Sequence, residues 1–115
     1  MIKDDFGKHD YVIFSFLCLE MDTETNFASL NQKNIREQLQ DQFNFKVNKS
    51  TVSKSVNNLI DLGYIIPMHN RTGFMVNPDI FYYGSPRYLN SKRKDFKKFC
   101  DEQQREPRAE FNHEL

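Results

Sequence analysis

The sequence predicts an α+β fold, mainly helical with one small β-hairpin, in a single domain. Three segments in the first half of the chain carry apolar residues at helical spacing, and two short β-prone runs follow them. A length of 115 residues provides one hydrophobic core, and the 11 phenylalanines supply apolar area that offsets the entropy of ordering the chain. These features argue against a disordered chain and against a second domain.

The first predicted helix spans about 8–21. Apolar residues cover so much of its circumference that most of this helix must be buried, which is typical of a core helix. A polar connector over 22–26 and a short extended or turning piece over 27–30 lead to the next helix. The apolar residues of the first helix are Tyr11, Val12, Ile13, Phe14, Phe16, Leu17 and Cys18.

The second predicted helix spans 32–43 and is capped by Asn31. Ile35, Leu39 and Phe43 recur every four positions, so one narrow face of this helix packs inward. The side chains expected to stay in solvent are Lys33, Arg36, Glu37 and Gln40.

The third predicted helix follows a turn over 44–49, and either Ser50 or Asn48 caps its first N–H groups. Gly63 ends it, because glycine adopts the left-handed conformation of helix C-termini without a Cβ penalty. The predicted buried stripe consists of Val52, Val56, Leu59 and Ile60.

Two β-prone runs, 64–66 and 74–76, are expected to form the hairpin, since the loop between them contains Asn and Gly. Pro67 has no N–H to donate, which places its strand at an edge of the sheet. The segment 77–79 is expected to restart a helix, and the apolar residues 80–83 to return to the core.

The predicted domain covers 1–105, with a helix-turn-helix over about 31–62 and a wing over about 64–77. A last helix is expected over about 88–104, followed by a flexible acidic tail over 106–115. Two short helices separated by a turn and followed directly by a β-hairpin are typical of a winged helix-turn-helix.

The formal net charge is zero, but the charge is unevenly distributed. Residues 1–42 carry 4 basic and 8 acidic side chains, residues 43–98 carry 10 and 3, and residues 99–115 carry 2 and 5. The balances are therefore −4, +7 and −3. A basic middle between acidic ends indicates a binding surface for a partner of negative charge.

By analogy with the winged motif, the third helix is the element that reads DNA, and its outward side chains follow from its buried stripe. No acidic residue lies between 44 and 60, whereas a merely solvated face normally mixes signs. Hydroxyls and amides can hydrogen-bond base edges or phosphates, and Asn57 can pair bidentately with adenine. The candidate DNA-binding residues are Lys46, Lys49, Ser50, Thr51, Ser53, Lys54, Asn57 and Asn58 at this helix, with His69, Asn70 and Arg71 at the hairpin tip.

These positions also have an ordinary structural interpretation. Polar residues on the outer face of a helix are solvated by default, and Ser50 is a common type of capping residue. Arg71 either enters a minor groove or is an exposed cation without a role. The cluster of the last helix forms either a wet helix face or a second phosphate contact, and comprises Lys92, Arg93, Lys94, Lys97 and Lys98.

Signals for catalysis and metal binding are absent from the sequence. His9, His69 and His113 are far apart, and none lies at metal-ligand spacing with Cys18 or Cys100. The chain has no glycine-rich phosphate loop and no nucleophile motif. We therefore expect no enzymatic activity, no metal and no cofactor.

Targeting signals are also missing. The first residues carry acid where a secretory signal carries base, and the apolar run 11–19 is shorter than the roughly 20 residues needed to cross a bilayer. We expect a cytoplasmic protein that does not contact a membrane, with Cys18 and Cys100 reduced.

Two stretches resemble the RepL-type replication proteins of small Gram-positive plasmids. They are STVSKSVNNLIDLGYII over 50–66 and GFMVNPDIFYYG over 73–84. The first stretch is also similar to MarR-like winged regulators, whereas the second is narrower, with Asn-Pro followed by Phe81 and Gly84. The resemblance implies binding to duplex DNA at a plasmid origin and recruitment of host replication proteins, without catalysis.

The N-terminal part of the chain departs from the pattern of that family, which leaves open a phage, mobile-element or plasmid regulator built on the same domain. We expect a sequence-specific double-stranded DNA-binding protein that acts in replication initiation. The alternatives are a winged-helix transcriptional repressor or copy-number regulator, and a winged-helix protein-interaction module. A homodimer through the first and last helices is also expected.

Overall fold

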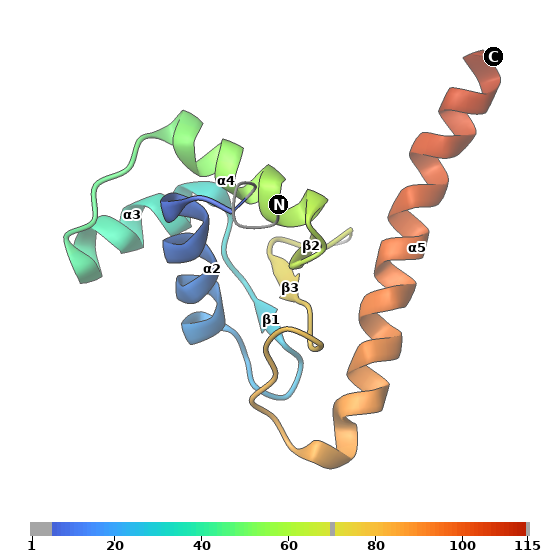
Figure 1. Cartoon of the computed structure of the whole chain (residues 1–115), viewed down its shortest axis with the longest axis horizontal. Coiled ribbons are helices and arrows are strands. Elements are labelled where there is room, and N and C mark those ends of the chain that lie inside the picture. Colours follow the sequence, from blue (N-terminus) through green and yellow to red (C-terminus); the bar gives the residue numbers. More distant parts are fainter. Residues whose placement is uncertain (1–5, 70, 115) are drawn as a thin grey trace.

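The computed structural model describes residues 6–69 and 71–114, with side chains described up to residue 103 (Figure 1). The fold is of the α+β class, mainly helical with a small antiparallel sheet, as the sequence predicted. The elements in chain order are α2 (Lys8–Glu20), β1 (Phe27–Ala28), α3 (Gln32–Phe43), α4 (Lys49–Asp61), β2 (Ile65–Pro67), β3 (Phe74–Val76), the short 3-10 helix η1 (Pro86–Tyr88) and α5 (Leu89–Glu114).

Asparagine side chains cap the two central helices. Asn31 begins α3, because its side chain accepts a hydrogen bond from the N–H of Asn34 (2.7 Å), as predicted. Of the two candidates for α4, Asn48 is the cap, and its Oδ1 accepts from the N–H of Thr51 (2.8 Å). The hydroxyl of Ser50 donates to the same oxygen (3.0 Å) and so supports the cap.

The sheet has three strands in the order β1-β3-β2. Gly63 ends α4 with φ of +80° and turns the chain into β2, and Pro67 lies at the edge strand, so both predictions are confirmed. Strand β1 pairs with β3 and adds a third strand to the predicted hairpin. A Cβ at Gly73 would collide with the carbonyl oxygen of Ala28, so the approach of these two strands requires glycine there.

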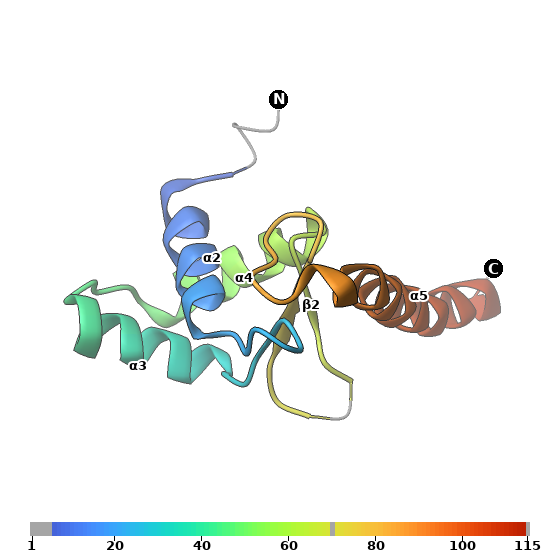
Figure 2. The ribbon, with the colours of Figure 1, turned by 90° about the horizontal axis from the view of Figure 1, so that it is seen from below.

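Both faces of this sheet are buried, which explains why its strands are apolar without interruption. Ile65 and Val76 point into the core formed with α2, α3 and α4. Ile66 and Met75 point to the opposite face, where Phe96 of α5 covers them. Figure 2 shows the same arrangement, with the sheet between the three helices and α5. Helix α5 therefore covers a second, smaller hydrophobic core.

The segment between β3 and α5 differs from the prediction. Residues 77–79 form a turn, because Asn77 accepts from the N–H of Asp79 (2.9 Å) and donates to the carbonyl oxygen of Gly63 (2.8 Å). The expected return to the core was wrong, since Ile80, Phe81 and Tyr83 are exposed. The side chain of Asn77 satisfies the local backbone in place of a helix.

The last helix is longer than expected. Its bounds are Leu89–Glu114, whereas the sequence indicated an end near 104 and a loose tail over 106–115. Phe96 is the buried phenylalanine among its described side chains. Among the described residues, no helix is long and apolar enough to span a membrane.

Candidate nucleic-acid interface

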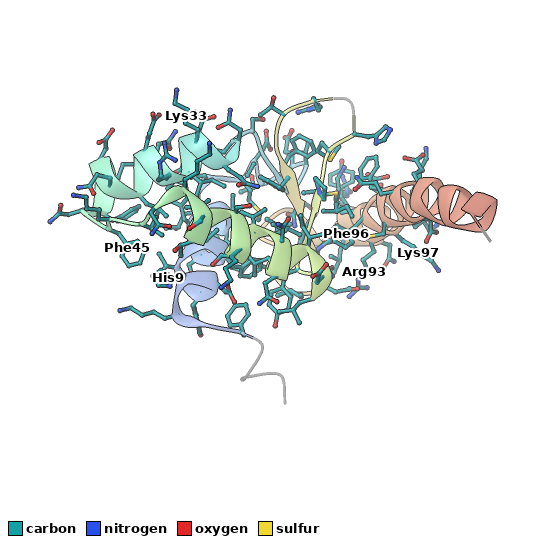
Figure 3. The ribbon with its side chains drawn as sticks, turned by 90° about the horizontal axis from the view of Figure 1, so that it is seen from above. His9, Lys33, Phe45, Arg93, Phe96 and Lys97 are labelled. Atoms are coloured by element: carbon teal, nitrogen blue, oxygen red, sulfur yellow. The ribbon has the colours of Figure 1, made fainter. Side chains whose placement is uncertain are left out.

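Helix α4 presents a polar outer face with an apolar inner one. Val52, Val56 and Leu59 are buried as predicted, whereas Ile60 is only partly buried and Ser55 takes a place in the stripe. Figure 3 looks onto the outer face, with α3 and the hairpin on one side of α4 and the start of α2 on the other. The predicted DNA contacts that are exposed are Lys46, Lys49, Ser50, Lys54, Asn57, His69 and Arg71. Those that are half-buried are Thr51, Ser53 and Asn58. Asn70 lies outside the described residues.

Asn58 has a structural role that its type and position did not reveal. Its amide nitrogen donates to Oδ2 of Asp10 in α2, at 2.8 Å. The same oxygen accepts the backbone N–H of Gly7, at 2.9 Å. Asp10 is almost fully buried and joins the start of α2 to the last turn of α4. Asn58 therefore fixes the angle between two helices, and the exposed amide of the face is Asn57.

The environment of Asp10 stabilises its charged form. Burial acts to raise its pKa, but hydrogen bonds from Ser55, from the N–H of Gly7 and from Asn58, with the charge of His9, hold it below the ordinary value of 3.8. A carboxylate whose pKa is lowered by folding stabilises the fold at any pH above its pKa in the unfolded chain. This contribution is lost as the pH falls through its pKa in the folded protein.

Asp10→Asn should therefore lower the free energy of unfolding at pH 7 by about 1–2 kcal/mol, because hydrogen bonds to a charged acceptor are weakened. The deficit should shrink when the pH falls below about 4, where the parent carboxylate is itself protonated. Urea unfolding at pH 7 and pH 3 measures this difference. Asp61→Asn, an exposed change on α4, serves as control. A deficit that is equal at both pH values would contradict the assigned role.

A basic hollow lies where the first turns of α3 and α4 meet. We use this name for the cavity of about 150 Å³ lined by Gln32, Lys33, Arg36, Lys49 and Val52. Three cations and no acid are among these lining residues, and Figure 3 shows Lys33 pointing outward from α3. Both helices also direct the positive ends of their dipoles to this region. Such a combination favours a phosphate group.

Sequence reasoning missed Lys33 and Arg36 as site residues. It placed both on the solvated face of the second helix and gave that face no role; in the structure Lys33 is exposed, whereas Arg36 is half-buried. The missing information is the crossing of α3 over α4, which brings these cations beside Lys49. Both residues lie near the N-terminus of α3, and cations beside a helix N-terminus could have indicated an anion site.

A second hollow, of about 540 Å³, separates the start of α2 from α4. Lys8 and His9 line one side, and Lys54 and Asn57 line the other. Two acids, Asp10 and the exposed Asp61, also line this hollow. The charge is thus mixed here, in contrast to the basic hollow.

The hairpin loop is held against the sheet by its own arginine. The guanidinium of Arg71 lies 4.0 Å from the centre of the Phe27 ring, and Phe27 is almost fully buried in β1. This cation–π contact gives Arg71 a structural function, and the side chain remains exposed. His69 is exposed near the tip of the same loop.

The basic cluster of α5 is partly paired with acids. Arg93 Nε donates to Asp79 Oδ1 (2.5 Å), and Lys92 lies 3.6 Å from Asp95. Lys97 is exposed on the outer side of the helix, and Lys94 and Lys98 are exposed as well. Figure 3 shows that α5 lies apart from α3. The cluster therefore forms a separate surface from the basic hollow.

Among the described residues, the cysteines, histidines and acids are the side chains that a metal site would use. No group of three or more His, Cys, Asp or Glu side chains there is placed to hold a metal ion. Burial raises the pKa of Cys18 to about 11, so its thiol is protonated at neutral pH. Burial, and then the charge of Asp101, also raises the pKa of Cys100.

Comparison of the chain with protein-family models, with curated proteins and with solved structures finds no match. A proposal for the function therefore depends on the geometry described above and on the sequences of 50–66 and 73–84.

Proposed function

We propose that this protein binds double-stranded DNA as a winged helix-turn-helix. In this proposal α3 and α4 are the helix-turn-helix, α4 is the reading helix, and the β2–β3 hairpin is the wing. The chain acts by binding and has no catalytic role of its own.

The observation that carries the proposal is the basic hollow beside the outer face of α4. Lys33 and Arg36 come from one helix and Lys49 from the next, and no acid is among the residues that line this hollow. A phosphate bound there would be held by three cations and by the free N–H groups of a helix start. Solvated faces usually mix the two charges, so an acid-free cluster from two helices favours a polyanion.

The proposal divides the contacts into two kinds. Lys33, Arg36 and Lys49 position the duplex through its phosphates, which carries no sequence information. Ser50 and Asn57 lie exposed on the outer face of α4, where hydroxyl and amide groups can read base edges in the major groove. Lys54, also exposed, is suited to either role.

The biological role that we propose is replication initiation on a plasmid or other mobile element, in the cytoplasm. The resemblance of 50–66 and 73–84 to RepL-type proteins supports this role, and it makes host replication proteins candidate partners. A repressor or copy-number regulator would use the same surface. Sites selected from fragments of the DNA that carries this gene distinguish these roles, because an initiator selects repeats of an origin and a repressor selects a promoter.

The test compares two triple variants with the same change in charge. Lys33→Ala, Arg36→Ala and Lys49→Ala together should weaken duplex binding by at least about tenfold and reduce the slope of log affinity against log salt by about 2–3. The matched triple on α5, Lys94→Ala, Lys97→Ala and Lys98→Ala, should leave both nearly unchanged. Fluorescence anisotropy with a selected duplex, from 50 to 200 mM salt, measures both quantities.

A third variant separates reading from positioning. Asn57→Ala should reduce the preference for the selected duplex over a scrambled one by about 1–3 kcal/mol, with an unchanged salt slope. Equal losses in the two triple variants would show a response to net charge alone and would contradict the site. A chain that shifts no duplex but retains a protein partner in a pull-down would favour the protein-interaction module.

A further inference from the structure

The outer side of α2 is apolar and exposed, and the proposed DNA contact does not use it. Tyr11 is 66% exposed and Leu19 is 71% exposed. Together with Phe43 of α3, which is 53% exposed, they border a groove of about 510 Å³ between the two helices. Large side chains exposed side by side on a small domain usually mark a contact surface.

The stripe that α2 contributes to this groove is symmetric about Ser15. Tyr11 lies four residues before Ser15 and Leu19 four residues after it, about 6 Å along the axis in each direction at 1.5 Å per residue. Ser15 is exposed and small, so another helix can approach closely there. An antiparallel helix with the same sequence, crossing at Ser15, would therefore place its Leu19 against Tyr11.

The charges at the two ends of α2 follow the same symmetry. Lys8 and His9 are exposed in the first turn, and Glu20 is exposed in the last turn, followed by Asp22 and Glu24. The helix dipole favours acids at the start of a helix and bases at its end. Buried Asp10 in the first turn follows this preference, whereas the exposed charges have the opposite order. An antiparallel second α2 would bring the acidic end of one copy beside the basic end of the other. The charge pattern that is unfavourable in one copy would then be complementary between two.

We propose that the groove between α2 and α3 is the seam of a homodimer in which two α2 helices pack antiparallel and cross at Ser15. A two-fold axis makes each contact occur twice, so Tyr11 meets the partner's Leu19 on both sides of the axis. Phe43 flanks the seam from α3. The groove holds none of the residues of the basic hollow, and it shares Lys8 with the hollow between α2 and α4. Tyr11 and Leu19 line neither hollow, so changes at these two positions leave the proposed DNA contacts in place.

The first experiment measures association without DNA. A seam of a single helix pair is small beside the roughly 800 Å² per partner that stable interfaces bury, so we expect a reversible dimer in sedimentation velocity between about 1 and 200 μM. Leu19→Glu should raise the dimer dissociation constant at least tenfold, without loss of helical signal because the side chain is exposed. Tyr83→Glu, at a site that is 76% exposed, is the matched control and should leave the dimer unchanged.

The second experiment tests the direction of the helices. In a background in which Cys18 and Cys100 are replaced by alanine, Tyr11→Cys and Leu19→Cys chains are oxidised separately and as a mixture. The antiparallel seam predicts disulfide-linked dimers between the two variants in the mixture and little linkage of either with itself. Linkage of each variant with itself would indicate parallel helices and overturn the proposal.

A parent chain that remains monomeric up to 200 μM would also overturn the homodimer. If a helix of another protein protected Tyr11 and Leu19 while this chain stayed monomeric, the groove would belong to that partner. Neither outcome decides whether the protein binds DNA. That question is answered by the triple variants of the basic hollow, whose affinity for a duplex is measured separately.

Discussion

Replacing Asn26 with alanine is expected to lower the free energy of unfolding by about 3 kcal/mol. The side chain is fully buried, and its amide nitrogen donates to the carbonyl oxygens of Val76 and Phe81, both at 2.9 Å. Alanine leaves both carbonyls without this donor, and each buried polar group that loses its partner costs about 1–3 kcal/mol. Oδ1 of Asn26 has no partner among the described residues, so its removal offsets part of this loss.

The backbone at Asn26 adds to the expected cost. Its φ is +62°, in the left-handed region that asparagine tolerates better than alanine. Asn44 offers a matched control, because its φ is +52° and its exposed side chain only accepts a hydrogen bond from Gln40. Asn44→Ala should therefore cost about 1 kcal/mol or less. Urea unfolding of both variants measures the difference, and equal losses would show that the buried amide of Asn26 contributes nothing.

The structure explains why Asn26 was assigned to a polar connector. Its role depends on Val76 and Phe81, which lie about fifty residues later in the chain. A hydrogen bond over such a separation leaves no local pattern. The pairing of β1 with β3 was missed for the same reason, since a two-residue strand such as Phe27–Ala28 has no periodicity to detect.

Features set by neighbouring residues were predicted well. Asn31 caps α3, Gly63 ends α4, and Pro67 lies at the edge of the sheet. Each follows from the chemistry of a residue type and a few adjacent positions. The turn at 77–79 is the exception, because the side chain of Asn77 competes with a helix that proline would otherwise permit there.

The candidate site was predicted in part. Helical periodicity alone placed Ser50, Lys54 and Asn57 on the outer face of α4. Asn58 was assigned to the same face, but α2 brings the carboxylate of Asp10 within hydrogen-bond distance of its amide. Helical periodicity cannot predict a partner that comes from another helix. The basic hollow depends on the crossing of α3 and α4, which the sequence does not specify.

Phe96→Ala is expected to destabilise the protein by about 3–5 kcal/mol, the usual range for removing a buried phenylalanine ring. The ring is 7% exposed and packs with Phe27, Ile66 and Met75 on the sheet face that α5 covers. Phe99 and Cys100 of α5 pack beside this cluster, and Arg93 and Gln103 donate hydrogen bonds to Asp79 and to the carbonyl oxygen of Pro67. Phe96 is therefore the buried centre of the contact between α5 and the sheet.

The loss should be uneven along the chain, because α5 can detach while the core of α2, α3 and α4 persists. Amide hydrogen exchange should therefore accelerate first over 89–103 and at the sheet positions Ile66 and Met75, which lose their cover. Tyr83→Ala, which removes an exposed ring, should change stability by less than about 0.5 kcal/mol. Uniform acceleration throughout α3 and α4 would instead show that the two cores unfold as one unit, in which case α5 is part of the main fold and Phe96 acts on the candidate DNA interface as well.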